Sequence, residues 1–225
     1  MNMSFEKKTV LIFISNILIG VGSVILILDF LPVFIGEISY QIRQIRHVEY
    51  SVDTAVSGKK ASDLFSALLN GSEVLDVEPT NTNFALVIEK IAVNAPVVKN
   101  VSVSDKDAYN TALNLGVAHA VTSSTPDKGG NTYLFAHSSI NFWRIGKYAN
   151  IFNLLRKLEN NDKINVFYEG KRYEYLVIGK EVVAGFNTYP LTRPVLEPVL
   201  TLQTCYPPGT TINRLVVTAR LEKVY

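Results

Sequence analysis

The stretch KINVFYEGKRYEYLVIG, residues 163–179, predicts a β-hairpin and decides the fold class. Apolar and aromatic residues recur in both of its halves, which is typical of strands that pack on a core. Glu169 and Gly170 separate the halves, and glycine supplies the positive φ that a tight turn needs. The stretch is therefore expected to form two antiparallel strands joined by a short turn.

Other short apolar runs bounded by turn residues continue this β pattern on both sides of the hairpin. They are FALVIEKIAV (84–93), VVKNVSV (97–103), NTYLFA (131–136), VLTLQTC (199–205) and RLVVTARLEKV (214–224). Two helical stretches interrupt the strands: DKDAYNTALNLG (105–116), which Gly116 is expected to end, and NIFNLLRKLEN (150–160), with Asn150 as the expected N-cap. Many short strands with few helices and one core predict a mainly β fold that closes, or nearly closes, into a barrel.

The length and composition of the chain limit its class. Its 225 residues, 48% of them hydrophobic, suffice for one domain of ordinary size and an appendage. The formal net charge of +2 is spread without a basic block, so a nucleic-acid partner is not expected. A single cysteine excludes an internal disulfide. The thiol is therefore free, paired with another chain, or chemically employed.

The N-terminal segment predicts a membrane anchor. Residues 10–28, VLIFISNILIGVGSVILIL, carry no charge, and about 20 residues suffice to cross a bilayer as a helix. A cleaved signal peptide is the alternative, but the run is long for one and no small-x-small cleavage site follows it directly. Lys7 and Lys8 before the run are matched by Arg43 and Arg46 after it, so charge does not decide the orientation. Retention of the short tail inside favours an extracytoplasmic C-terminal domain.

The only cysteine lies in LTLQTCYPPGTTINRLVV, residues 200–217. Cys205 ends one strand-like run and Arg214 begins the next, so pairing of the two runs would bring sulfur and guanidinium to the same end of the sheet. A thiol has an ordinary pKa of about 8.5, and a nearby cation favours the thiolate. A guanidinium beside a nucleophile also suits stabilisation of the oxyanion in acyl transfer.

Three histidines are candidates for the base that this thiol needs. His47 lies after the anchor and is interpreted as a surface residue. His119 follows a predicted helix, and packing in the core or a loop is the favoured interpretation. His137 closes the run NTYLFA where a strand becomes a loop, and such strand ends commonly present reactive groups. These residue types alone do not establish catalysis, because free cysteines are often buried structural residues.

The motifs around these residues resemble those of the sortases, membrane-anchored cysteine transpeptidases of bacterial surfaces. TLQTC with the nearby arginine is similar to their T-L-x-T-C and Arg signature. The resemblance covers about residues 84–222 and includes EKIAVNAPVV, ALNLGVAHAVTSSTPDKGGNTYLFAHSS and FNLLRKLENNDKINVFYEGKRYEYLV. It implies a closed sortase-like β-barrel in which Cys205 is the nucleophile and His137 the acid/base. Arg214 is implied as the partner of the oxyanion or of the substrate carbonyl.

Two positions depart from the family pattern. Ala136 replaces the glycine that usually precedes the histidine, and Asn161 replaces the glycine of the family's L-x-x-G-D turn. Both changes are mild at turns. The eight residues between Cys205 and Arg214 are similar to the spacing in pilin-polymerising sortases.

The resemblance implies that the protein cleaves a C-terminal sorting motif, such as Leu-Pro-x-Thr-Gly, of secreted proteins through a thioacyl intermediate. An amine from a peptidoglycan precursor or a pilin lysine would then take the acyl group. Family position makes residues 182–199 the recognition loop and Ala118 a wall residue of the substrate groove, while Thr204 is a wall candidate by its adjacency to the cysteine. Trp143 is interpreted as packing on the barrel. No cofactor and no metal site are expected, because no metal-ligand spacing stands out.

The predicted division of the chain has four parts. They are a cytoplasmic tail (1–8), a transmembrane anchor (9–35), a stalk (36–82) in which ISYQIRQI and SDLFSALL form short helices, and a sortase catalytic domain (83–225). Two alternative functions stay open. One is a cysteine hydrolase of surface peptides, and the other is a non-catalytic, membrane-tethered β module in which Cys205 is a buried structural residue.

Overall fold

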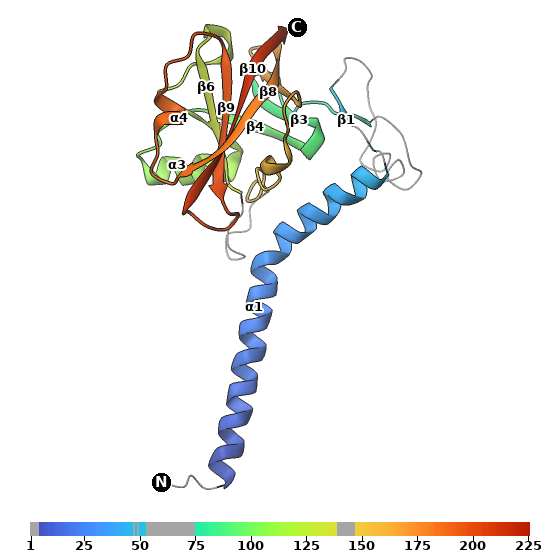
Figure 1. The fold of residues 1–225 in the computed structure, drawn as a ribbon, viewed down its shortest axis with the longest axis vertical. Helices are drawn as coiled ribbons and strands as arrows, with labels where there is room; N and C mark the ends of the chain where they lie inside the picture. The colour runs from blue at the N-terminus through green and yellow to red at the C-terminus, as the bar shows by residue number, and fades with distance from the viewer. Residues whose placement is uncertain (1–4, 47, 49, 53–74, 139–146) are drawn as a thin grey trace.

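Within the residues that the structure describes, eight strands close into a barrel (Figure 1). The computed structural model describes residues 5–46, 48, 50–52, 75–138 and 147–225. The barrel strands are β3 (Phe84–Ile88), β4 (Val93–Val101), β5 (Val117–Ala120), β6 (Asn131–Phe135), β7 (Lys163–Tyr168), β8 (Lys171–Ala184), β9 (Val199–Tyr206) and β10 (Asn213–Val224). Their order is β10-β8-β7-β3-β4-β5-β6-β9, and β9 pairs with β10 to close the ring. The predicted mainly β barrel is confirmed.

The hairpin that decided the fold class joins β7 and β8. Tyr168 pairs with Lys171, which leaves a turn of two residues. Glu169 and Gly170 both have positive φ, 48° and 79°. Positive φ at both central residues defines the turn whose twist matches that of antiparallel strands. The predicted turn is therefore present, with a glutamate as well as a glycine in the left-handed region.

Two strand predictions need correction. The run 84–93 was expected to be one strand, but β3 ends at Ile88, the 3-10 helix η1 (Glu89–Ile91) follows, and β4 begins at Val93. Ala92 takes a φ of 53°, so the chain turns sharply there and β4 comes back antiparallel to β3. The short strand β5 was not predicted as a strand at all. It is recognisable only through its partners, because it pairs with β4 on one side and β6 on the other.

Helix α3 (Lys106–Leu115) forms where it was predicted. The side chain of Asp105 caps it by accepting hydrogen bonds from the N–H groups of Asp107 and Ala108, both at 3.0 Å. Gly116 ends it, as expected, but with a φ of 164°, which is extended backbone. Glycine is needed there for space, because a Cβ on Gly116 would lie 2.2 Å from the carbonyl oxygen of Pro96.

The helix expected over residues 150–160 is wrong. The structure has turns there and one 3-10 helix, η3 (Leu155–Lys157). The carbonyl oxygens of Arg156 and Leu158 accept hydrogen bonds from the Lys180 ammonium on β8, at 2.6 and 2.8 Å, instead of continuing a helical ladder. Contacts with the barrel thus override the local helical pattern.

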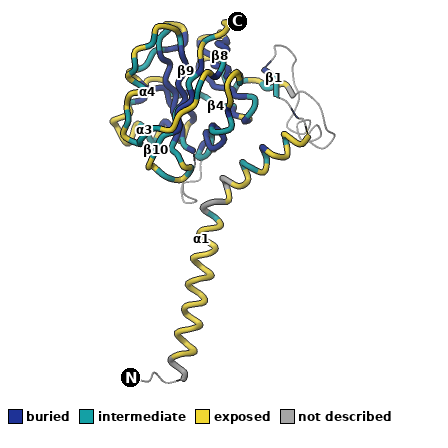
Figure 2. Tube along the Cα trace, viewed as in Figure 1, coloured by how far each residue is buried: buried dark blue, intermediate teal, exposed yellow. Residues whose placement is uncertain are grey.

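Burial is concentrated inside the barrel, as Figure 2 shows. The largest fully buried side chains are Tyr175, Phe152, Leu86, Ile88, Leu113, Leu134, Leu155, Leu158, Ile164, Leu200, Leu202 and His119. A close-packed interior holds the strands in one arrangement. Residues at the strand ends therefore keep fixed positions relative to one another.

A long helix, α1 (Phe5–Ile45), precedes the barrel. Its stretch Lys8–Leu28 is exposed (Figure 2) and long and apolar enough to cross a membrane, by length and composition. ISYQIRQI, expected as a separate short helix, is the end of this same helix, whereas SDLFSALL lies outside the described residues. Two short strands, β1 (Tyr50–Ser51) and β2 (Leu75–Asp76), then pair in parallel beside the barrel. The predicted boundaries between anchor, stalk and domain stay predictions.

Candidate active site

Cys205 and Arg214 are paired across two neighbouring strands. Cys205 lies near the end of β9 and Arg214 near the start of β10, and the antiparallel register sets them directly opposite each other. Directly opposite residues in such a pair have Cβ atoms about 4.5–5.5 Å apart on the same face of the sheet. The thiol and the guanidinium therefore lie at the same end of the barrel.

His137 reaches this end of the barrel through the strand on the other side of β9. β6 runs parallel to β9, and beyond its last residue the N–H of Ala136 still donates to the carbonyl of Gln203, at 3.2 Å. His137 follows immediately, so its backbone leaves the sheet beside the Cys205 end of β9. Its carbonyl accepts a hydrogen bond from the N–H of Phe152 at 3.0 Å, which holds the start of the following loop.

The ring of Tyr109, on helix α3, joins this group. It stacks on Phe135 with 5.0 Å between ring centroids and stands edge-on to the His137 ring at 6.5 Å. Burial, reinforced by the charge of a Cys205 thiolate and opposed by Arg214, raises the pKa of Tyr109 to about 12. The phenol therefore stays protonated at physiological pH, within electrostatic reach of both residues. Sequence reasoning missed Tyr109, because nothing in its helix distinguishes it from an ordinary core aromatic.

The environment of Cys205 has two opposing effects on its thiol. Burial raises the pKa of the partly exposed Cys205 thiol, and the Arg214 cation lowers it, with burial the larger effect. The cation of Arg214 favours the thiolate, as expected from the sequence. The net effect of the environment is nevertheless to raise the pKa of the thiol, because burial outweighs the cation. A thiol with a raised pKa is mainly protonated at neutral pH. Its conversion to a nucleophile needs a base within reach, and His137 lies at the same edge of the sheet.

The guanidinium of Arg214 is held by the loop between β9 and β10. Nη1 donates to the carbonyl oxygens of Thr211 and Asn213, at 3.1 Å each. These bonds fix the direction of a planar, permanent cation at the rim beside the sulfur. Such a cation can stabilise the negative charge that develops on a carbonyl oxygen when a thiolate attacks the carbonyl carbon.

The two predicted groove residues are both buried. Thr204 is 4% exposed, and its hydroxyl donates to the carbonyl of Ala136 at 2.8 Å, which ties β9 to the strand end that leads into His137. Ala118 is 0% exposed in β5, opposite Phe135 on β6. The structure thus places both residues behind the rim. Their contact with substrate stays a prediction.

The predicted recognition loop, residues 182–199, is fastened to the barrel in its middle. It includes the short helix α4, built on four residues (Tyr189–Thr192). The side chain of Asn131 donates to the carbonyl of Pro190 at 3.0 Å, and Arg193 donates to the hydroxyl of Thr218 at 2.7 Å. These bonds add to the restriction that the prolines of the loop place on φ. The role of the loop in recognition stays a prediction.

Of the remaining candidates, the structure describes only His119, which lies in the core. His119 is 0% exposed in β5; its Nε2 lies 3.1 Å from the carbonyl oxygen of Ser124, and its Nδ1 accepts a hydrogen bond from the N–H of Asn100 at 3.3 Å. This agrees with the packing interpretation. His47 and Trp143 lie outside the described residues. Among the residues whose positions are described, no group of three or more His, Cys, Asp or Glu side chains could hold a metal ion.

The fold and the strand ends define the class of the protein, a β-barrel enzyme whose one thiol lies at the barrel rim. A sequence profile of the sortase domain matches residues 86–222, more than half of the chain. The chain therefore belongs to the sortase family, whose members are cysteine transpeptidases. The comparison with curated protein sequences gave no significant match.

Solved structures of sortases share the fold. Sortase A of Listeria monocytogenes is 22% identical with a TM-score of 0.51, over 64% of this chain and 88% of that chain. The sortase D5 transpeptidase of Clostridium perfringens is 20% identical with a TM-score of 0.51, over 65% and 82%. A pilus-related sortase C of Group B Streptococcus is 24% identical with a TM-score of 0.51, over 65% and 70%. At these identities the similarity establishes the fold alone.

Proposed function

We propose that this sortase cleaves the C-terminal sorting motif of secreted proteins, a motif such as Leu-Pro-x-Thr-Gly. The thiolate of Cys205 attacks the carbonyl carbon of the threonine-like residue, and the C–N bond to the next residue breaks as a thioester forms. His137, which has taken the proton of the Cys205 thiol, gives it to the leaving amine. An incoming amine then attacks the thioester while His137 takes its proton, and a new amide bond forms as the thiolate leaves.

The observation that carries this proposal is the pairing of Arg214 with Cys205 in the β9–β10 register. His137 follows the end of β6, the strand on the opposite side of β9. A peptide carbonyl at this edge would meet side chains from three adjacent strand ends. Groups held ready in this way lower the barrier, because they need not be assembled from solution during the reaction.

Two buried residues have a supporting part in the proposal. Thr204 and Ala118 back the substrate groove, and their small side chains leave the neighbouring strand ends undisturbed. The hydroxyl of Thr204 is already engaged with Ala136, at 2.8 Å. Larger side chains at either position are expected to displace the rim rather than to contact substrate directly.

The cell membrane is the proposed location. In this proposal the apolar stretch Lys8–Leu28 of α1 crosses the bilayer once, and the barrel lies on the extracytoplasmic side. The acceptor is an amine of a peptidoglycan precursor or the lysine of a pilin. A shared membrane plane would raise the effective concentration of an anchored enzyme, a secreted protein with a hydrophobic tail and a lipid-linked precursor.

A peptide assay tests the reaction. The full chain in detergent micelles is incubated with a fluorescent sorting-motif peptide, with and without an amine acceptor such as triglycine or lysine. A ligated product that depends on the acceptor supports transpeptidation, whereas cleavage that is indifferent to the acceptor supports the hydrolase alternative. Absence of both turnover and a thiol-trapped acyl species overturns the proposal and leaves the non-catalytic alternative.

A pair of variants separates chemistry from folding. Cys205→Ala is expected to abolish turnover with almost no change in melting temperature, because the thiol is partly exposed. Arg220→Ala is the matched control, since Arg220 is an exposed residue on β10 at the opposite end from Arg214. It is expected to keep full activity.

A further inference from the structure

The C-terminal part of α1 is attached to the barrel by charged contacts. The Glu37 carboxylate forms ion pairs with Arg156 and with Lys157, the latter at 2.5 Å. A hydrogen bond from Lys157, with the two cations, lowers the pKa of Glu37 against the opposing effect of burial. These contacts hold residues that the predicted division of the chain assigns to a stalk.

Apolar packing continues this contact along one face of the helix. Tyr40 is 9% exposed and belongs to the buried core, and the ammonium of Lys157 lies 5.3 Å from the centre of its ring. Gly36 lies one turn earlier on the same face. A Cβ at Gly36 would come within 3.1 Å of the Asn153 amide nitrogen, so the helix and the barrel touch closely. We call the contact of Gly36, Glu37 and Tyr40 with residues 153–157 the helix seam.

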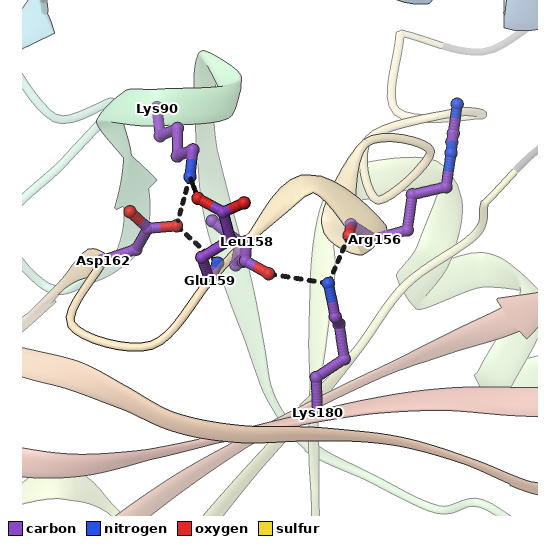
Figure 3. A network of polar contacts seen from close by, with 6 residues as sticks. All are labelled: Lys90, Arg156, Leu158, Glu159, Asp162 and Lys180. Atoms are coloured by element: carbon purple, nitrogen blue, oxygen red, sulfur yellow. Dashed lines mark hydrogen bonds and ion pairs between the residues drawn. The ribbon is translucent and has the colours of Figure 1, made fainter.

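The barrel side of the helix seam is itself fixed. Figure 3 shows Lys90 between Glu159 and Asp162, with distances of 2.8 and 2.9 Å. It also shows the Lys180 ammonium bonded to the carbonyl oxygens of Arg156 and Leu158. Both lysines come from the barrel wall, η1 and β8. The segment that receives Glu37 is thus fastened to the barrel by two lysines.

Little length separates the helix seam from the apolar stretch of α1. Seven residues separate Leu28 from Gly36, all of them helical, and the rise from one to the other is about 12 Å of helix axis. Figure 1 shows α1 bending part-way along its length, and the helix continues through the bend. Because α1 is one continuous helix, it sets the orientation of the barrel relative to the apolar stretch Lys8–Leu28, which a flexible linker would not do.

The end of the barrel that carries the candidate site faces the N-terminal half of α1. Figure 1 shows the loop between β9 and β10 at the lower end of the barrel, the side on which the N-terminal half of α1 lies, and the C-terminus at the upper end. Cys205 and Arg214 flank this loop. We call this end of the barrel the site rim.

The site rim also presents apolar side chains to the outside. Phe186 is 89% exposed and Ile212 is 69% exposed. Phe186 follows the end of β8 and Ile212 precedes the start of β10. The two segments are joined, because the N–H of Gly185 donates to the carbonyl of Ile212 at 2.9 Å. Exposed aromatic and aliphatic side chains at one end of a protein suit the boundary between lipid headgroups and acyl chains.

We propose that the helix seam holds the site rim against the lipid surface, with Phe186 and Ile212 in the interface and Cys205 just above the headgroups. This rests on the proposed membrane anchor. The occupant of the rim is the bilayer in which the chain's own helix is embedded, since only a short rigid segment separates the two. The enzyme is then selective for peptide bonds that lie close to the membrane. Substrates in which a long spacer separates the sorting motif from a membrane-spanning tail would be cleaved poorly.

Fluorescence quenching in nanodiscs tests the orientation. The full chain with Cys205→Ala receives one cysteine, by Thr211→Cys on the site rim or by Lys223→Cys at the opposite end, and a fluorophore is attached to it. The nanodiscs contain phosphatidylcholine, phosphatidylglycerol and a lipid with a headgroup quencher. Strong quenching at position 211 and none at position 223 is expected. Equal quenching at the two positions overturns the proposal.

Seam variants test the cause of the orientation. Glu37→Lys places like charges beside Arg156 and Lys157, and loss of the difference between the two labels is expected. Arg156→Glu with Lys157→Glu in the same chain should restore the difference, while Gln44→Ala, at an exposed residue of the helix beyond the helix seam, should leave it intact. An unchanged difference in the Glu37→Lys chain overturns the role of the helix seam.

Two further readouts separate this inference from the proposed function. Elution of the chain with the nanodisc reports the anchor, so a chain that inserts but shows no orientation contradicts the inference alone. A chain that does not insert contradicts the anchor and the inference with it. Phe186→Ser with Ile212→Ser should weaken quenching at position 211, and Leu196→Ser, at a fully exposed leucine remote from the site rim, should not.

Discussion

The ring of Tyr109 stands edge-on to the imidazole of His137, with 6.5 Å between the ring centroids and an interplanar angle of 78°. It also stacks on Phe135 of β6, the strand that leads into His137. The aromatic ring of Tyr109 therefore packs against the imidazole. Aromatic pairs of this kind are worth about 0.5–1.5 kcal/mol beyond the area that they bury.

Loss of the Tyr109 ring is expected to slow the reaction. Tyr109→Ala should lower kcat/KM by about 3- to 10-fold, the equivalent of one aromatic contact. Tyr109→Phe keeps the ring and should stay within about twofold of the parent. Steady-state kinetics with the sorting-motif peptide measure both variants. A Tyr109→Phe loss as large as that of Tyr109→Ala would mean that the hydroxyl is the important group.

Removal of the Arg214 cation is expected to make the Cys205 thiol less acidic. Burial raises the pKa of this thiol and Arg214 opposes the shift, so Arg214→Ala should move the pKa further upward. The thiolate then forms only at higher pH. The rate of alkylation by iodoacetamide against pH reports this directly, and its midpoint should move to higher pH in Arg214→Ala and less in Arg214→Lys, which keeps a positive charge.

Arg214→Ala also tests the role of the guanidinium in catalysis. Arg214→Ala should lower kcat/KM by about 100-fold or more, as loss of an oxyanion donor does in other enzymes. Arg220→Ala, at the other end of β10, should change neither the alkylation profile nor the kinetics. An alkylation midpoint that is the same in the parent and in Arg214→Ala would show that the guanidinium does not influence the sulfur.

Sequence reasoning predicted that the candidate site residues lie at strand ends, and the strands end where it placed them. Cys205 precedes a short loop and Arg214 follows it, so their pairing depended only on two adjacent runs being neighbours in a sheet. His137 was selected because it closes a predicted strand. The hairpin at Glu169 was predictable for the same reason, since its turn residues are local.

Other features depend on partners that are distant in the sequence. Tyr109 meets His137 only after α3 has packed on the barrel, and no local pattern marks it. The pattern of residues 150–160 favours a helix, but Lys180 and the core draw the segment into turns. The salt bridges of Glu37 join a helix to a barrel segment more than a hundred residues later. Such contacts have no signature in a single sequence.

Gly185 is expected to be essential for the shape of the rim. A Cβ at this position would lie 2.7 Å from the carbonyl oxygens of both Ile212 and Thr211. The Thr211 carbonyl also accepts a hydrogen bond from Arg214, so displacement of the loop would disturb the guanidinium. Gly185→Ala should therefore cost about 1–3 kcal/mol of stability and lower kcat/KM as well.

Gly179, within β8, provides the control for this substitution. A Cβ at Gly179 would have no atom within 4 Å, so Gly179→Ala should change stability by less than about 0.5 kcal/mol. Thermal unfolding and peptide kinetics of the two variants measure the difference. If Gly185→Ala behaves like Gly179→Ala in both measurements, the loop between β9 and β10 can move to accept a Cβ at position 185 without loss of stability or activity.

His119 is expected to make the barrel less stable at acid pH. Burial is the main cause that lowers the pKa of His119 from its ordinary value of 6.5. The unfolded chain therefore takes up this proton at a higher pH than the folded chain does. The stability that the neutral imidazole contributes is complete above pH 6.5, and it declines as the pH falls below that value, by up to about 1.4 kcal/mol per pH unit.

The hydrogen bonds of His119 give the reason for this penalty and the means to test it. Its Nδ1 accepts from the N–H of Asn100, and a protonated ring nitrogen can no longer accept. His119→Gln keeps a polar side chain without a titrating group, so its free energy of unfolding should change less between pH 7.5 and 5.5 than that of the parent. Urea denaturation of the full chain in detergent micelles at both pH values gives the comparison. Since His137 is common to both chains, identical pH dependence in the two would show that His119 titrates in the fold as it does in water.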